Sequence, residues 1–186
     1  MTIFIIKKIF MKNIILIISF IFFFQKILYS QIAFPSYIYT DAGFTMPALD
    51  NDFTKTYLTG PTLSGGIGFI LSKNIIAKAE IGYNHFYLKN NTVVSGLTII
   101  SYLINLNFGN FNSKGITPFG IAGIGAYTLN DFSSSQTNIG FDFGVGISGS
   151  YKNNLIPFGD IQLSYNMNSG LAKGYIPVRI GIIYRL

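Results

Sequence analysis

Hydrophobic and polar residues alternate with a period of two along much of this chain. In residues 138–151, every second position is apolar and the intervening positions are Gly, Ser, Asn or Asp. Residues 156–167 and 75–88 repeat the pattern. Successive side chains of a strand point to opposite faces, whereas a helix of period 3.6 would mix the two sets. The pattern therefore predicts strands with one apolar face and one small or polar face.

Five further segments fit the same pattern less regularly, and stretches rich in Gly, Asn, Ser and Asp separate them. They are residues 36–46, 61–71, 93–108, 116–129 and 173–186. The total is eight strands joined by seven connections, with both termini at one end, as in bacterial outer-membrane barrels. The sequence thus predicts an all-β fold, an eight-stranded antiparallel up-and-down transmembrane β-barrel, in a single domain over residues 31–186.

Composition indicates which face of the barrel meets which solvent. The chain is 49% hydrophobic and 11% charged, whereas soluble domains have about 25% charged residues. A soluble barrel needs a charged exterior, and here the polar positions of the strands are mostly Gly, Ser and Asn. The apolar face is therefore expected to lie in lipid. Beyond residue 30, no stretch approaches the ~18 apolar residues of a membrane helix.

Residues 1–30 have the pattern of a signal peptide. A lysine-bearing segment (Lys7, Lys8 and Lys12) precedes an apolar run at residues 14–24, which suits a secretory leader better than a bilayer span. Cleavage is expected after Ser30, so that the mature chain begins at Gln31. The alternatives are an uncleaved helical anchor and a start at Met11.

Charge and residue usage exclude several function classes. Four of the 13 basic residues lie in the leader, and no Lys/Arg run remains that could follow a nucleic-acid backbone. The chain has no Cys and a single His, His85, so thiolate and multi-imidazole metal sites are excluded. His85 lacks the spacing to a Ser that a lipid-hydrolysing barrel would use, and its parity directs it outward near the rim. No catalytic, metal or cofactor site is predicted.

The strand positions that alternate with the apolar ones contain the charged residues, which are therefore expected to point into the barrel interior. Because desolvated charges need partners, these residues are expected to form a lumen charge network, with Arg179 between Asp41 and Asp160 and with Arg185 as a further member. An eight-stranded barrel is just filled by its own side chains, so a wide pore is disfavoured. A narrow, gated ion path stays open as an alternative. The predicted network comprises Asp41, Lys78, Glu80, Asp142, Asp160 and Arg179.

Aromatic residues of the apolar parity are expected to form girdles at the two membrane interfaces. One girdle comprises Tyr83, Tyr87, Phe141 and Tyr165, and the other comprises Phe108, Tyr151 and Tyr184.

The C-terminal residues 179–186 and the Gly-rich strand at residues 118–125 carry a resemblance to a known family. The chain resembles the small outer-membrane β-barrel proteins similar to the transmembrane domain of outer-membrane protein A and to outer-membrane protein X. The loop from Met46 to Gly60 is also similar to a loop of these barrels. The resemblance implies that the last strand is an assembly signal read by the barrel-insertion machinery, although Leu186 replaces the usual terminal Phe. The signal positions are Arg179, Gly181, Tyr184 and Leu186.

The expected function is that of a non-enzymatic scaffold, structural or adhesive, in the outer membrane of a Gram-negative bacterium. It would present extracellular loops to a ligand, and its other partners would be outer-membrane lipid and the insertion machinery. A small gated channel is the alternative function. A lipid-modifying barrel enzyme is a third, which would need a catalytic pair that the sequence does not show.

Overall fold

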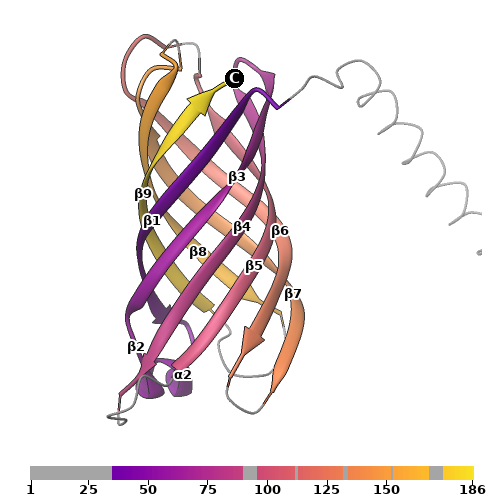
Figure 1. Ribbon diagram of the computed structural model, residues 1–186, viewed down its shortest axis with the longest axis vertical. Coiled ribbons are helices and arrows are strands. Elements are labelled where there is room, and N and C mark those ends of the chain that lie inside the picture. The colour runs from indigo at the N-terminus through magenta and orange to yellow at the C-terminus, as the bar shows by residue number, and fades with distance from the viewer. Residues whose placement is uncertain (1–34, 90–95, 112, 132–133, 152, 168–173) are drawn as a thin grey trace, which may run out of the picture. The chain divides into compact units, whose positions relative to one another are not determined.

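The computed structural model describes residues 35–89, 96–111, 113–131, 134–151, 153–167 and 174–186. The predicted leader and its cleavage site at Ser30 lie outside the described residues. Within them, eight long strands wind obliquely around a barrel (Figure 1). The strands are β1 (Tyr37–Ala48), β3 (Gly60–Ser72), β4 (Ile75–Leu88), β5 (Gly96–Gly109), β6 (Thr117–Asn130), β7 (Ser135–Ser148), β8 (Leu155–Asn166) and β9 (Gly174–Arg185).

The sheet is closed by its first and last long strands. β9 pairs antiparallel with β1 along its whole length, from Tyr37 opposite Arg185 to Ala48 opposite Gly174. Every other long strand pairs antiparallel with its neighbours in sequence, and β4 pairs with β5 on one side and β3 on the other. The predicted fold is therefore confirmed: the described residues form a closed, eight-stranded, antiparallel barrel. The strand boundaries agree with the predicted ones to within three residues.

The two faces of the wall have opposite polarity. Large apolar side chains point outward on every strand, and among the most exposed are Ile180 at 75%, Ile104 at 64% and Ile139 at 61%. Charged and amide side chains point inward, and all six residues of the predicted lumen network are at most 5% exposed. This arrangement is the reverse of that in a water-soluble protein, where apolar side chains are buried and charged side chains are exposed. No helix among the described residues is long and apolar enough to cross a bilayer.

The lumen is filled in three layers. A buried aromatic and aliphatic cluster lies at the end where β1 begins and β9 ends, here called the terminal end; it includes Tyr37, Phe111 and Phe158. A second cluster lies toward the opposite end, the loop end, and includes Phe53, Phe86 and Tyr127. The buried charged side chains lie between the two clusters. Apolar side chains therefore close the interior on both sides of the charged layer.

Tyr151 belongs to the terminal-end cluster, which corrects its predicted place in a lipid-facing girdle. The side chain is 5% exposed and its ring packs edge-on against Phe111, at 5.0 Å between ring centroids. The cause is that β7 ends at Ser148, three residues earlier than the pattern indicated, so Tyr151 lies in a turn that folds over the barrel mouth. The other six predicted girdle residues lie on outward-facing strand positions, with Phe108 and Tyr184 being 45% and 47% exposed.

A short helix, α2 (Asn51–Thr56), and a two-residue strand, β2 (Tyr57–Leu58), occupy the connection between β1 and β3. The Asp50 side chain caps the helix by accepting hydrogen bonds from the backbone amides of Asp52 and Phe53. Phe53 is fully buried and packs on Phe86, so the helix covers the lumen at the loop end. The sequence predicted a loop here, because a helix of six residues is too short for a periodic pattern.

Candidate functional site

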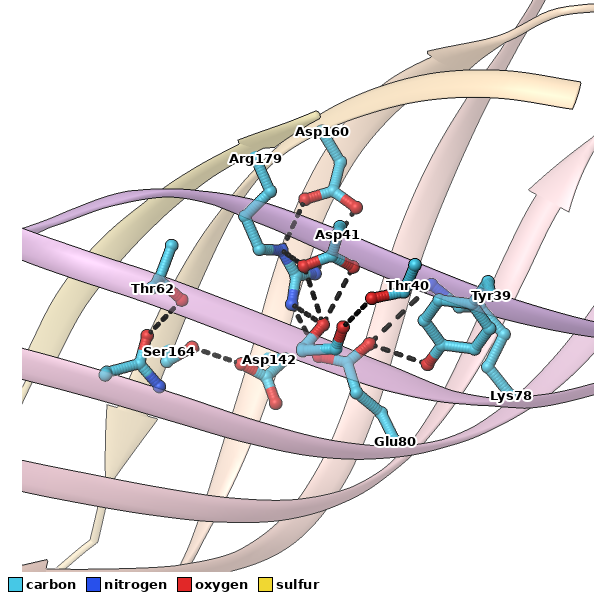
Figure 2. Close-up of polar contacts among 12 residues, drawn as sticks. Tyr39, Thr40, Asp41, Thr62, Lys78, Glu80, Asp142, Asp160, Ser164 and Arg179 are labelled. Carbon is cyan, nitrogen blue, oxygen red and sulfur yellow. Dashed lines mark hydrogen bonds and ion pairs between the residues drawn. The ribbon is translucent and has the colours of Figure 1, made fainter. Parts of the chain in front are cut away.

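The buried guanidinium of Arg179 is the centre of the charged layer (Figure 2). Its Nε donates to Asp160 Oδ1 at 3.0 Å and its Nη2 to Asp160 Oδ2 at 3.3 Å, a two-pronged contact. Its Nη1 donates to Glu80 Oε1 at 2.5 Å. The Nε also lies 3.7 Å from Asp41 Oδ1. One arginine thus interacts with three carboxylates from three different strands.

The sheet register explains how such large side chains fit into a narrow lumen. Arg179 lies opposite Asp160 on β8 and opposite Gly43 on β1. Glu80 and Lys78 on β4 lie opposite Gly66 and Gly68 on β3. A Cβ at Gly66 would lie 2.9 Å from the Tyr39 hydroxyl, and one at Gly68 would lie 1.9 Å from the Tyr37 ring. These glycines therefore leave room for the two tyrosines that share the lumen with Glu80 and Lys78.

Hydroxyl groups extend the network around Arg179. Ser64 Oγ lies 2.7 Å from both carboxylate oxygens of Asp41 and also accepts a hydrogen bond from Arg179 Nη1 at 3.1 Å. Tyr39 donates from its hydroxyl to Glu80 Oε2 at 2.9 Å. These contacts satisfy the lone pairs that burial would otherwise leave without partners.

Lys78 marks the boundary between the charged layer and the terminal-end cluster. Its Nζ lies 3.6 Å from Glu80 Oε2 and 4.0 Å from the centroid of the Tyr39 ring, with the Phe158 ring 5.5 Å away. The ammonium group is therefore stabilised by one carboxylate and by cation–π contact with aromatic rings. At 4% exposure it has little contact with solvent.

Asp142 forms a separate part of the layer. It accepts hydrogen bonds from the Tyr127 hydroxyl at 2.6 Å and from the Ser164 hydroxyl, and it makes no ion pair with a described basic residue. The buried layer contains two more acidic than basic residues, because Lys78 and Arg179 face four acids. Asp142 is thus the carboxyl group held by neutral donors alone.

The structure places all six predicted lumen residues in one layer, and it places Arg179 beside both Asp41 and Asp160. Arg185 lies elsewhere: its side chain is exposed at the end of β9 and its Nη1 donates to the Tyr151 carbonyl. The strand has already left the lumen at that point, which corrects its expected membership.

Sequence reasoning did not identify Glu80 as a partner of Arg179, nor Tyr39 and Tyr127 as donors. Tyr39 has the same parity as Asp41, two positions away. That shared parity was an available signal that the Tyr39 side chain points into the lumen.

The single histidine and the central arginine are each held by neighbouring side chains. Among the described residues, no group of three or more His, Asp or Glu side chains is placed to hold a metal ion. His85 faces outward near the loop end, where its Nδ1 lies 3.0 Å from Thr98 Oγ1 and its ring packs edge-on against Tyr87. Arg179 is fixed by its carboxylates, and an aromatic cluster lies on each side of it.

Comparison with solved structures supports the fold. The chain is similar to the crystal structure of Neisserial surface protein A, with a TM-score of 0.58 and 12% identity over 81% of this chain and 96% of that one. It is also similar to the N-terminal β-barrel domain of Pseudomonas aeruginosa OprF, with a TM-score of 0.51 and 15% identity over 82% of this chain and 98% of that one. No protein-family model matches the chain, and no curated protein matches it in sequence.

Proposed function

We propose that this protein is a non-enzymatic outer-membrane barrel of a Gram-negative bacterium, which acts as a structural or adhesive scaffold presenting its loops outside the cell. One observation carries the proposal: the polarity of the wall is inverted, with isoleucines such as Ile180 exposed and charged residues such as Arg179 buried. Only closed barrels and helices cross a bilayer, because every backbone polar group must be paired there.

The lengths of the connections support an orientation. The connections between long strands at the terminal end span residues 73–74, 110–116 and 149–154. Those at the loop end span residues 49–59, 89–95, 131–134 and 167–173; they are longer on average, and the first contains α2. Outer-membrane barrels have short periplasmic turns and longer extracellular loops. The terminal end therefore faces the periplasm and the loop end faces outward.

The layered lumen supports a scaffold over a pore. An ion crossing the barrel would have to displace Phe53 and Phe86 at one end and Tyr37 and Phe158 at the other, all of which are nearly inaccessible. Reconstitution into planar bilayers is the test. We expect no discrete conductance steps, and steady single-channel currents would favour the channel alternative instead.

The connection at residues 49–59 supports an adhesive role because it forms a helix that is tied to the neighbouring strand. Lys89 donates from its Nζ to the Thr54 carbonyl at 2.6 Å, and this bond ties the end of β4 to α2. Burial and the nearby Asp131 raise the pKa of the Tyr57 hydroxyl. Replacing residues 49–59 with a short Gly/Ser turn should abolish attachment of expressing cells to a host-cell or matrix surface while the barrel still assembles.

Location and closure are tested together by fractionation. The protein should appear in the outer-membrane fraction and migrate differently on gels with and without heating. N-terminal sequencing of that material should show a chain that begins near Gln31, and an intact Met1 or Met11 start there would contradict the proposed leader. An unchanged lipid A mass on expression is expected, and a mass shift would favour a lipid-modifying enzyme.

A further inference from the structure

Acidic residues are segregated along the barrel axis. All seven acidic residues of the chain are either in the lumen layer (Asp41, Glu80, Asp142, Asp160) or in the connections of the loop end (Asp50, Asp52, Asp131). The connections of the terminal end contain no Asp or Glu side chain. Exposed basic residues occur at both ends, but at the terminal end Lys73, Lys114 and Arg185 have no acidic side chain among them, whereas Lys55 and Lys89 share the loop end with three aspartates.

Hydrogen bonds join the segments that carry these basic residues into one surface, here called the terminal rim. Its described residues are 73–74, 110–111, 113–116, 149–151, 153–154 and Arg185. The amide of Phe111 donates to the Lys73 carbonyl at 2.9 Å. Ser150 donates from its hydroxyl to the Ser113 carbonyl at 3.1 Å. With the bond from Arg185 to Tyr151, three connections that are distant in sequence form a single rim.

The terminal rim is continuous with the apolar exterior. Phe108 and Tyr184 are 45% and 47% exposed on the adjoining strand ends, and Ile116 is 75% exposed within the rim itself. Aromatic side chains that face outward at the end of a barrel belong to the interface between hydrocarbon and headgroups. The basic groups that lie just beyond them are therefore at headgroup depth.

We propose that the terminal rim binds anionic phospholipid headgroups, with Lys73, Lys114 and Arg185 contacting the phosphates. The proposal rests on the proposed membrane location and adds a lipid preference to it. Each basic residue near an anionic lipid surface contributes about 1 kcal/mol, or roughly fivefold in affinity. The exposed basic groups are spread along a rim that borders lipid, which fits a row of headgroups better than one free phosphate ion.

The test uses the full folded barrel in nanodiscs of phosphatidylcholine, with or without phosphatidylglycerol as a minor component. Two variants are compared: Lys73→Gln/Lys114→Gln at the terminal rim, and Lys55→Gln/Lys89→Gln at the loop end, which removes the same charge. Native mass spectrometry counts the phosphatidylglycerol molecules that stay bound, and amide NMR shifts at residues 73 and 114 locate them.

Wild type and the loop-end variant should retain phosphatidylglycerol equally. The terminal-rim variant should lose retention by roughly fivefold for each lysine removed. Equal retention by the two variants would overturn the proposal. So would identical NMR shifts when inorganic phosphate is added to discs of phosphatidylcholine alone. Failure of the wild type to integrate into either disc would instead contradict the proposed membrane location.

Discussion

Arg179 and Glu80 are 99 positions apart in the sequence, yet Nη1 of the arginine lies 2.5 Å from Oε1 of the glutamate. The two residues lie on β9 and β4, with β1 and β3 between them in the wall. Their contact therefore reaches across the lumen and exists only when β9 has paired with β1. Formation of the charged layer and closure of the barrel are one event.

Substituting Arg179 by Met should destabilise the barrel more than any change of an exposed basic residue. The substitution leaves Asp41, Glu80 and Asp160 without their shared cation, and loss of one partner of a buried pair costs about 3–5 kcal/mol. Urea titration of the refolded protein measures the change in the free energy of unfolding. Lys73→Met, in an exposed turn, is the matched control, and equal midpoints for the two variants would refute the central role of Arg179.

Two carboxylates of the same layer should respond oppositely to amide substitution. Asp160→Asn removes a charge that Arg179 contacts with two nitrogens, and hydrogen bonds between charged groups are worth about 1.5–3 kcal/mol each. Asp142→Asn removes a charge held only by the hydroxyls of Tyr127 and Ser164, in a layer with excess negative charge. We expect the first variant to lower the urea midpoint and the second to leave it unchanged or raise it.

A larger loss for Asp142→Asn than for Asp160→Asn would contradict this assignment. Tyr127→Phe is a useful companion because it removes one of the two donors to Asp142 and leaves the ring in its cluster. It should destabilise the wild type and have less effect when Asp142 is already Asn. A double-mutant cycle between the two positions measures that coupling.

The wall of the barrel could be predicted from the sequence because its signal is local. A period of two fixes which residues share a face, so the strands and the burial of Lys78 and Asp160 followed directly. The position of Tyr151 could not be predicted in the same way. It lies in a turn beyond the end of β7, and extending the strand pattern to it placed its ring on the lipid face. Tyr37 shares the inward parity of Asp41, but parity alone does not show that its ring packs against Tyr151.

The partners of Arg179 show the same limit. Asp160 and Asp41 lie on the two strands that flank β9 in a closed barrel, so register arguments reach them. Glu80 lies on β4, which does not neighbour β9, and its contact with Arg179 depends on the length of the two side chains. Such contacts across a lumen have no signature in the spacing of a single sequence.

Glycines that face the lumen should be intolerant of a methyl group, whereas a glycine on the outer face should tolerate one. A Cβ at Gly68 would lie 1.9 Å from the Tyr37 ring, which is itself fixed in the terminal-end cluster. A Cβ at Gly120 would meet nothing within 4 Å. Gly68→Ala should cost about 1–3 kcal/mol through overpacking, and Gly120→Ala should be near neutral. Thermal unfolding of both variants in the same detergent is the measurement, and similar losses would contradict the tight packing around Tyr37.

Substitution of Tyr184 distinguishes a role of the last strand in assembly from its contribution to stability. Its side chain is 47% exposed on the lipid face, so Tyr184→Asp places an acid toward lipid, at a cost below the ~2–4 kcal/mol of a base at midplane. Tyr102, 49% exposed at the middle of β5, provides the control because Tyr102→Asp imposes a larger lipid penalty outside the C-terminal strand. If residues 179–186 are the signal for insertion, Tyr184→Asp and deletion of Leu186 should reduce heat-modifiable barrel in cells far more than Tyr102→Asp does. All three variants should still fold in detergent, where no insertion machinery acts. Equal yields of the Tyr184 and Tyr102 variants in cells would show that the last strand contributes to stability alone.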